Sequence, residues 1–182
     1  MYPEALGNQL LETGLFHADD LPLPDLLLVD ITHQTLTHYC TGDVRHVYPV
    51  STSRHGPGNR NYSFQTPLGL HRICEKIGAG CAAGEIFRAR VPQGEIFTRS
   101  AGAAQDDVIT SRILWLAGLQ AGLNLGEGCD SRERYIYVHG TADEASIGRP
   151  ASIGCVRMLN HDVIELFNQV EVGTHVFITE SL

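Results

Sequence analysis

The chain alternates short runs of apolar, β-branched and aromatic residues with segments rich in glycine, proline and asparagine. Such spacing is typical of many short strands joined by turns. In the first half it predicts strands over residues 26–31, 35–39, 46–51 and 69–74. Pro49, inside the third of these, suggests an edge strand, because proline has no amide hydrogen to donate to a neighbour.

The middle of the chain contains a local echo, in which Gly-Glu-Ile-Phe occurs at residues 84–87 and again at 94–97. Two strands folded into a hairpin explain it, with residues 92–94 as the turn. Residues 109–119 have the composition of a strand, although a short helix also fits. The Gly/Ala-rich residues 78–84 are either a lid over a cleft or a plain connection, and residues 100–107 are expected to form a loop.

The second half opens on the aromatic and β-branched residues 135–138, which predict a strand that delivers His139 and Gly140 at its end. A helix is expected from Asn160 as its cap, and a last strand over residues 175–179. A short helix over 4–13 precedes the first strand. These elements predict a mainly β fold with a few short peripheral helices. Residues 1–24 would be an N-terminal helix and linker, and residues 25–182 one domain.

Charge and composition exclude two classes of protein. The 182 residues carry a formal net charge of −8 and no run of Lys or Arg, so the electrostatic pattern of a nucleic-acid binder is absent. No apolar stretch is long enough to predict a membrane span, and Met1–Leu11 does not resemble a signal peptide. The sequence as written indicates a cytoplasmic protein. A shortened sequence or another export route would indicate the periplasm. The oligomeric state is left open.

The cysteine and histidine positions predict no metal or other cofactor. Five cysteines without close pairs fit neither a disulfide framework nor a zinc site, although Cys74 and Cys81 could bridge under oxidising conditions. Five histidines are scattered without the i, i+4 spacing of a helical metal site: His33, His38, His46, His55 and His71.

The candidate chemistry lies between Tyr135 and Arg157. His139 ends a predicted strand, and Cys155 follows in the segment Ser152-Ile153-Gly154-Cys155-Val156-Arg157. A thiol is a good nucleophile only as the thiolate, and a neighbouring imidazole can take its proton. The imidazole needs an acceptor for its other nitrogen, which a backbone carbonyl near Gly140 or Thr141 would provide. On spacing alone, a buried structural cysteine remains an alternative.

Gly154 allows a sharp turn, so the amides of Gly154 and Cys155 could converge on a developing oxyanion. Arg157 could hold a substrate carboxylate or brace the loop.

The segments His139-Gly140 and Ser152-Ile153-Gly154-Cys155-Val156-Arg157-Met158 resemble the active-site signature of L,D-transpeptidases, the YkuD-like catalytic domain. Further matches in family order extend the resemblance from about Leu26 to Ile178: Val29-Asp30, Tyr48-Pro49-Val50-Ser51-Thr52, Thr66-Pro67-Leu68-Gly69, Asn160, Asp162-Val163, Glu165-Leu166 and Gly173-Thr174-His175-Val176. The sequence departs from the family pattern at Ile153, where the family often has His, and at Ser53, where Gly is common.

The resemblance implies a β-sandwich or barrel-like domain that acts on peptidoglycan stem peptides or muropeptides. Cys155 would attack the stem after its third residue, a diamino acid, and release the terminal D-alanine, with His139 as base and then acid. The thioester would pass to an amine of a second stem. Arg157 and Ser152 would shape the pocket, or act respectively as a loop-bracing salt bridge and a turn cap. Tyr62 and Phe64 would form a substrate wall or pack in the core.

Three alternatives stay open from the sequence. An L,D-carboxypeptidase would pass the acyl group to water, in cytoplasmic recycling of cell-wall peptides or as a secreted effector. A catalytically silent peptidoglycan-binding module would share the fold. A redox or metal-binding role is disfavoured by the absence of a Cys-x-x-Cys motif.

Overall fold

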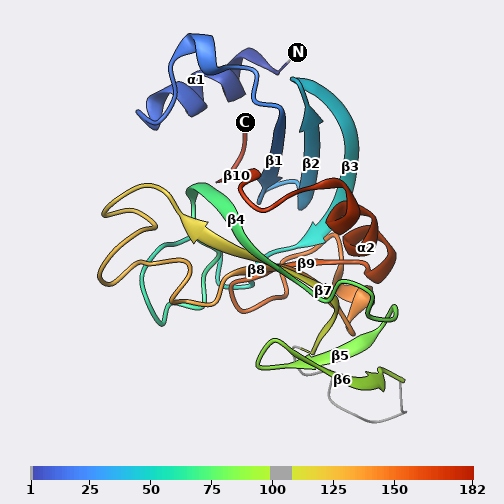
Figure 1. Cartoon of the computed structure of the whole chain (residues 1–182). Coiled ribbons are helices and arrows are strands. Elements are labelled where there is room, and N and C mark those ends of the chain that lie inside the picture. Colours follow the sequence, from blue (N-terminus) through green and yellow to red (C-terminus); the bar gives the residue numbers. More distant parts are fainter. Residues whose placement is uncertain (1, 99–107) are drawn as a thin grey trace.

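The computed structural model describes residues 2–98 and 108–182 (Figure 1). The expected loop over residues 100–107 therefore lies outside the described residues. Ten strands and two α-helices are found in the described part of the chain, with two 3-10 helices, Ala18–Asp20 and Glu144–Ser146. The α-helices are α1 (Glu4–Glu12) and α2 (Asn160–Gln169). The strands are β1 (Asp25–Asp30), β2 (Thr35–Cys40), β3 (Asp43–Ser51), β4 (Gly69–Ile77), β5 (Glu85–Arg88), β6 (Val91–Ile96), β7 (Ile109–Gly118), β8 (Tyr137–Thr141), β9 (Val156–Met158) and β10 (His175–Thr179).

Eight of these strands close on themselves. Hydrogen bonding runs in the order β4-β10-β1-β2-β3-β9-β8-β7, and β7 pairs in turn with β4. The β5–β6 hairpin pairs with the first residues of β7, Ile109 and Thr110, through β5. The expectation of a mainly β, sandwich-like or barrel-like domain is confirmed, and the ambiguous residues 109–119 form a strand. Pairing through residues far apart in the sequence holds the domain together.

The core lies inside the ring and under α2. Alternate residues of the strands point inward, among them Val138, Val156 and Met158, and meet the apolar face of α2 at Val163 and Leu166. All five are fully buried. This period-two pattern leaves the intervening residues of β8 and β9 on the outer face, where the candidate chemistry is found.

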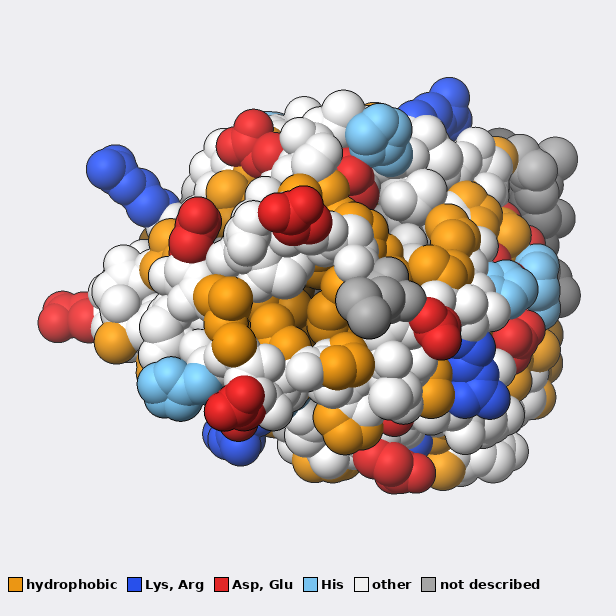
Figure 2. All heavy atoms as spheres, turned by 90° about the horizontal axis from the view of Figure 1, so that it is seen from above, with side chains coloured by type: hydrophobic (Ala, Val, Ile, Leu, Met, Phe, Trp, Pro, Cys, Tyr) orange, Lys and Arg blue, Asp and Glu red, His pale blue; other side chains and the backbone are white. Residues whose placement is uncertain are grey.

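Helix α1 packs on a second apolar cluster at the end of the domain away from the β5–β6 hairpin (Figure 1). Leu6 and Leu10, one turn apart, are fully buried there against Leu26 and Leu28 of β1. Figure 2 looks down on this end, where apolar side chains gather around a hollow. In the described part of the chain, neither helix is long and apolar enough to cross a membrane.

The hairpin is confirmed, but its predicted turn is wrong. Ala89 and Arg90 form the turn, with φ of 47° and 69°, while residues 92–94 lie within β6. Two consecutive residues with positive φ match the right-handed twist of hairpin strands, so a two-residue turn is favoured here. Strand β6 is exposed along its whole length, and an edge position of this kind tolerates Pro92.

The edge prediction from Pro49 is also wrong. Strand β3 lies inside the sheet, between β2 and β9. Pro49 itself pairs only with Thr35 of β2, because β9 pairs with β3 at Val50 and Ser51 alone. A proline is therefore accommodated inside the sheet where its second side lacks a partner strand.

Candidate active site

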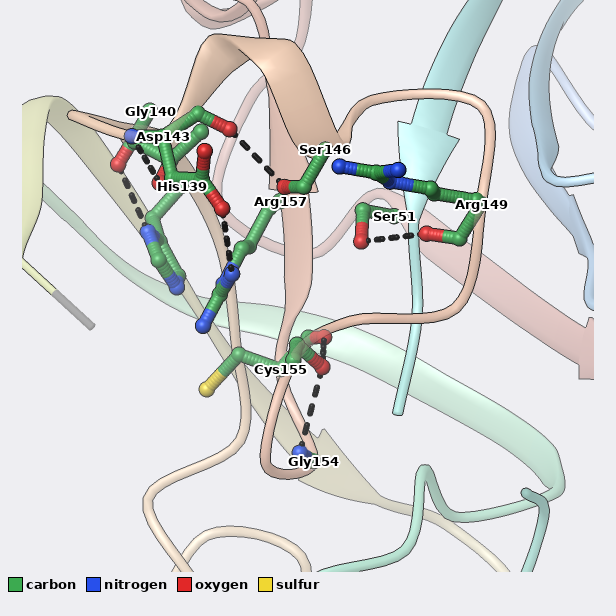
Figure 3. Close-up of polar contacts among 11 residues, drawn as sticks. Ser51, His139, Gly140, Asp143, Ser146, Arg149, Gly154, Cys155 and Arg157 are labelled. Carbon is green, nitrogen blue, oxygen red and sulfur yellow. Dashed lines mark hydrogen bonds and ion pairs between the residues drawn. The ribbon is translucent and has the colours of Figure 1, made fainter. Parts of the chain in front are cut away.

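The two candidate groups lie on one face of a parallel strand pair. His139 is the register partner of Arg157, and Val138 is the partner of Val156. In a parallel pair, register partners point to the same face, and the face changes with each residue. Because Val138 and Val156 point into the core, His139, Arg157 and Cys155 belong to the outer face. Figure 3 shows the imidazole, the guanidinium and the sulfur on the same side of the pair.

His139 lies in the middle of β8 rather than at a strand end. The strand begins at Tyr137, because Tyr135 has a φ of 56° and does not continue the ladder. The residue is 1% exposed, and its Nδ1 atom lies 2.7 Å from the carbonyl oxygen of Gly140. A carbonyl can only accept, so Nδ1 carries the proton and the neutral ring keeps the lone pair on Nε2. His139 is thus held in the tautomer of a base.

Gly140 itself leaves no room for a side chain. A Cβ atom there would lie 2.6 Å from the Thr110 carbonyl oxygen and 2.8 Å from Oδ1 of Asn160. The side-chain amide of Asn160 donates from Nδ2 to the carbonyl of Thr141. Asn160 is the first residue of α2 rather than its cap; its backbone amide and its Nδ2 both donate to Glu144 Oε1, at 2.7 and 2.9 Å. These bonds fix the backbone at residues 140 and 141.

The sulfur of Cys155 is placed by backbone groups. The amide of Tyr137 donates to Sγ at 3.4 Å, and the thiol donates to the carbonyl of Tyr135 at 3.4 Å. Gly154, with a φ of 131°, makes the turn that presents the thiol. Its amide donates to Ser152 Oγ at 3.2 Å, and that hydroxyl donates to the Cys155 carbonyl at 2.6 Å. Ser152 is fully buried and closes this turn.

Arg157 is buried against an acidic partner that sequence reasoning missed. Its side chain is 6% exposed, and its guanidinium lies 3.9 Å from the Asp143 carboxylate, as Figure 3 shows. Asp143 follows β8 after a turn in which its amide donates to Thr141 Oγ1. A single Asp in a loop gives no signal in the sequence, since only the fold brings it to β9. The ion pair is the arrangement expected of a residue that braces the loop.

A cavity of about 400 Å³ opens beside the Cys155 loop. Its lining includes Tyr62, Phe64 and Ile153, whose residues are 91%, 54% and 41% exposed. The reading of Tyr62 and Phe64 as core residues is therefore wrong. Both have left-handed backbone conformations, with φ of 62° and 58°, as has Tyr135 in the same lining. Such strain costs energy and is common where a ligand is bound.

Arg134, also in this lining, was missed by the sequence reasoning. Its guanidinium donates to the carbonyls of Gly58 and Gln65 and to Ser63 Oγ, so it braces the loop that carries Tyr62. Burial lowers the pKa of Arg134, and electrostatic interaction with Cys155 and, more weakly, with Cys129 raises it. A partly buried cation therefore lies within electrostatic reach of the thiol.

Among the described residues, neither a disulfide nor a cluster of metal ligands is found beside Cys155. All five cysteines are free thiols, Cys74 and Cys81 among them. Over residues 2–98 and 108–182, no group of three or more His, Cys, Asp or Glu side chains is arranged to hold a metal ion.

Comparisons with known proteins place the chain among relatives of one family. The model of the L,D-transpeptidase catalytic domain (YkuD) family matches residues 24–178, which confirms the resemblance. The Bacillus subtilis (strain 168) proteins YqjB and YkuD, whose names class them provisionally as L,D-transpeptidases, are 47% identical over 55 residues and 56% identical over 48. These segments cover 30% and 26% of this chain, and only 30% and 29% of the two relatives.

Solved structures extend the likeness to the whole domain. L,D-transpeptidase 3 from Mycobacterium tuberculosis, in complex with a faropenem-derived adduct, superposes with a TM-score of 0.54. The match covers 86% of this chain and 60% of that one, at 18% identity. At that identity the likeness establishes the fold.

Proposed function

The chain belongs to the L,D-transpeptidase catalytic domain family, and from that premise we propose that Cys155 carries the acyl group and His139 moves the protons. The observation that carries the proposal is the 2.7 Å contact from His139 Nδ1 to the Gly140 carbonyl. It leaves Nε2 as the basic atom, on the face of β8–β9 to which Cys155 belongs. A thiol and a basic nitrogen on one rigid face are the two groups that acyl transfer needs.

In the first half-reaction, Nε2 of His139 takes the thiol proton of Cys155. The sulfur forms a bond with the carbonyl carbon of the third residue of a stem peptide. The resulting tetrahedral oxyanion is stabilised by the amides of Gly154 and Cys155, each donor lowering the barrier by about 3 kcal/mol. The Gly154 amide donates to Ser152 Oγ in the free protein, so it serves the oxyanion by exchanging that bond.

Collapse of this intermediate breaks the amide C–N bond. His139 returns its proton to the leaving amine of D-alanine, and a thioester remains on Cys155. In the second half-reaction an amine of another stem attacks the thioester carbonyl and the C–S bond breaks, while His139 takes the proton of the amine and returns it to the sulfur, which regenerates the thiol. The product is a cross-link between two stems. If water attacks instead, the same steps yield a carboxypeptidase product.

Peptidoglycan stems are the proposed substrates and partners, because the family's name and chemistry point to them. The chain aligns with only about 30% of the length of its curated relatives, so this activity is proposed for the chain. Residues 25–182 would carry the catalysis, and the preceding helix would cover the far end of the barrel.

A synthetic tetrapeptide stem ending in D-alanine, incubated with and without an amine acceptor, tests the proposal. We expect release of D-alanine and, with acceptor present, a cross-linked product detected by liquid chromatography and mass spectrometry. Cys155→Ala should abolish both. Cys129→Ala, which removes another thiol, should abolish neither. Binding of the stem without any release of D-alanine would contradict the proposal and identify a silent peptidoglycan-binding module.

A further inference from the structure

Three aromatic side chains form a platform on one side of Cys155. Trp115 of β7 and Tyr137 of β8 are register partners, with ring centroids 5.6 Å apart in an edge-to-face arrangement. Tyr135 lies 5.8 Å from Trp115. The Cys155 side chain packs against the same apolar cluster as Trp115 and Tyr137. The platform is therefore continuous with the surroundings of the proposed nucleophile.

Arg90 lies on this platform, carried there by the turn of the β5–β6 hairpin. Its guanidinium carbon lies 4.9 Å from the centroid of Trp115 and 5.1 Å from that of Tyr135. The same group donates a hydrogen bond of 3.1 Å to the Tyr137 hydroxyl. Stacking on two rings and bonding to a third fixes a side chain that is otherwise flexible. The side chain is thus preorganised rather than merely exposed.

Tyr137 connects Arg90 to the nucleophile. The backbone amide of Tyr137 donates to Cys155 Sγ at 3.4 Å, and its hydroxyl at the other end accepts from Arg90. One tyrosine therefore spans the distance between the guanidinium and the sulfur. When the carbonyl carbon of a stem peptide lies at Cys155 Sγ, the carboxylates of that peptide can therefore reach the Arg90 guanidinium.

A second guanidinium lies at this platform, although the chain as a whole has a net charge of −8. That of Arg132 is 5.4 Å from the Trp115 centroid, and Glu75, the register partner of Trp115, is an acid within electrostatic reach of Arg90. Arg90 is partly exposed, and a guanidinium has five N–H donors, of which the tyrosine bond uses one. A planar fork of this kind matches a carboxylate in two parallel hydrogen bonds.

We propose that Arg90 is a specificity-determining residue that binds a carboxylate of the donor stem peptide, which makes the β5–β6 hairpin part of the substrate site. The inference rests on the proposed function, because it names what the same site recognises. The D-alanine carboxylate and any side-chain carboxylate of the third residue are both candidates, and they share this chemistry. The carboxylate accepts hydrogen bonds from the exposed edge of the guanidinium, which itself lies over the rings of Trp115 and Tyr135.

The test measures binding in the Cys155→Ala background, so that no chemistry is required. Isothermal titration is carried out with three tetrapeptide stems: one with both carboxylates free, one with the D-alanine as its amide, and one with the third-residue side chain as its amide. The variants are Arg90→Gln, Arg90→Lys and, as matched control, Arg88→Gln. Arg88 is an exposed arginine two positions earlier on the same hairpin.

We expect Arg90→Gln to weaken binding of the free-acid stem about tenfold and to leave binding of one amidated stem unchanged. Arg90→Lys should recover part of the loss, and Arg88→Gln should bind as the parent does. An equal loss for all three stems would show that Arg90 only supports the hairpin. That result, no loss for any stem, or no binding of any stem would overturn the inference. Because the titration needs no turnover, its outcome is separate from the D-alanine release that tests the proposed function.

Discussion

His139 of β8 and Arg157 of β9 are direct register partners across a parallel strand pair. This single relationship orders the site, because it brings Cys155, two positions before Arg157, to the face that carries the imidazole. The preceding register pair, Val138 and Val156, is fully buried in the core. Packing of the inner face thus fixes the register, and the register fixes the position of the base beside the loop that holds the nucleophile.

The first prediction concerns Gly140. In Gly140→Ala the new methyl group would lie 2.6 Å from the Thr110 carbonyl oxygen, so the backbone that accepts from His139 must shift. We expect a loss of about 1–3 kcal/mol in the free energy of unfolding and a marked fall in the rate of Cys155 acylation. Denaturant unfolding and acylation kinetics measure the two effects.

The matched control is Gly7→Ala in α1, where a Cβ atom has nothing within 4 Å and φ is not positive. It should leave acylation unchanged and stabilise the protein by up to about 1 kcal/mol, as alanine does in a helix. Equal acylation rates in Gly140→Ala and the parent would refute the orienting role of this carbonyl.

The second prediction concerns the Asp143–Arg157 ion pair. Asp143→Asn preserves the shape of the side chain but leaves the buried guanidinium of Arg157 without its acidic partner, so stability should fall by about 1–3 kcal/mol. Thermal and urea unfolding measure the change. Glu95→Gln, the same loss of one negative charge at an exposed position of β6, should fall within about 0.5 kcal/mol of the parent. Identical stability of the two variants would mean that the pair contributes nothing.

Much of this fold could be predicted from period-two patterns. The last strand is predicted at its observed bounds, and strands β1 and β2 within one residue, because each is short, rich in apolar or β-branched residues, and bounded by turns. Strand β8 begins two residues and ends three residues later than predicted. Errors arose where turn geometry overrides composition. The hairpin turn uses Ala89 and Arg90, although Gly94 looked like the better turn residue.

The third prediction concerns the cation near the thiol. Arg134→Gln removes a partly buried positive charge that interacts with Cys155, so less of the thiol should ionise at mildly acidic pH. We expect the rate of iodoacetamide alkylation at Cys155 near pH 6 to fall severalfold. Arg60→Gln, an exposed arginine of the neighbouring loop, is the control and should react as the parent does. A faster or unchanged rate in Arg134→Gln would contradict the interaction.

The fourth prediction concerns stability against pH. Burial lowers the pKa of His71 from 6.5 to about 4. Between about pH 4 and pH 6.5, the imidazole is therefore protonated in the unfolded chain and neutral in the folded protein. Stability from this residue is present above about pH 6.5 and is lost as the pH falls towards 4, by about 3 kcal/mol in total.

His71→Gln should remove this step from the stability curve while keeping a donor and an acceptor for Gly69 and Ser131. The measurement is urea unfolding at intervals from pH 4 to pH 8. His17→Gln removes an exposed imidazole and should keep the dependence of the parent. A parent-like step in His71→Gln would assign the loss of stability to other groups.

The sequence identified the groups of the candidate site that lie close together along the chain, and missed those that the fold brings from elsewhere. Cys155 and His139 belong to recognisable segments, and Gly154 lies in the same motif. Asp143, Arg134 and Arg90 have no sequence signal, because each reaches the site through a loop or a hairpin turn whose position depends on tertiary packing. A single exposed Arg in a hairpin gives no indication of the aromatic platform that receives it.

The central claim is an activated thiol at Cys155, and intact mass after incubation with the carbapenem imipenem tests it most directly. We predict a single covalent adduct in the parent protein and in Cys129→Ala, none in Cys155→Ala, and a much slower adduct in His139→Gln. An adduct that persists in Cys155→Ala, or none in the parent, would contradict the account.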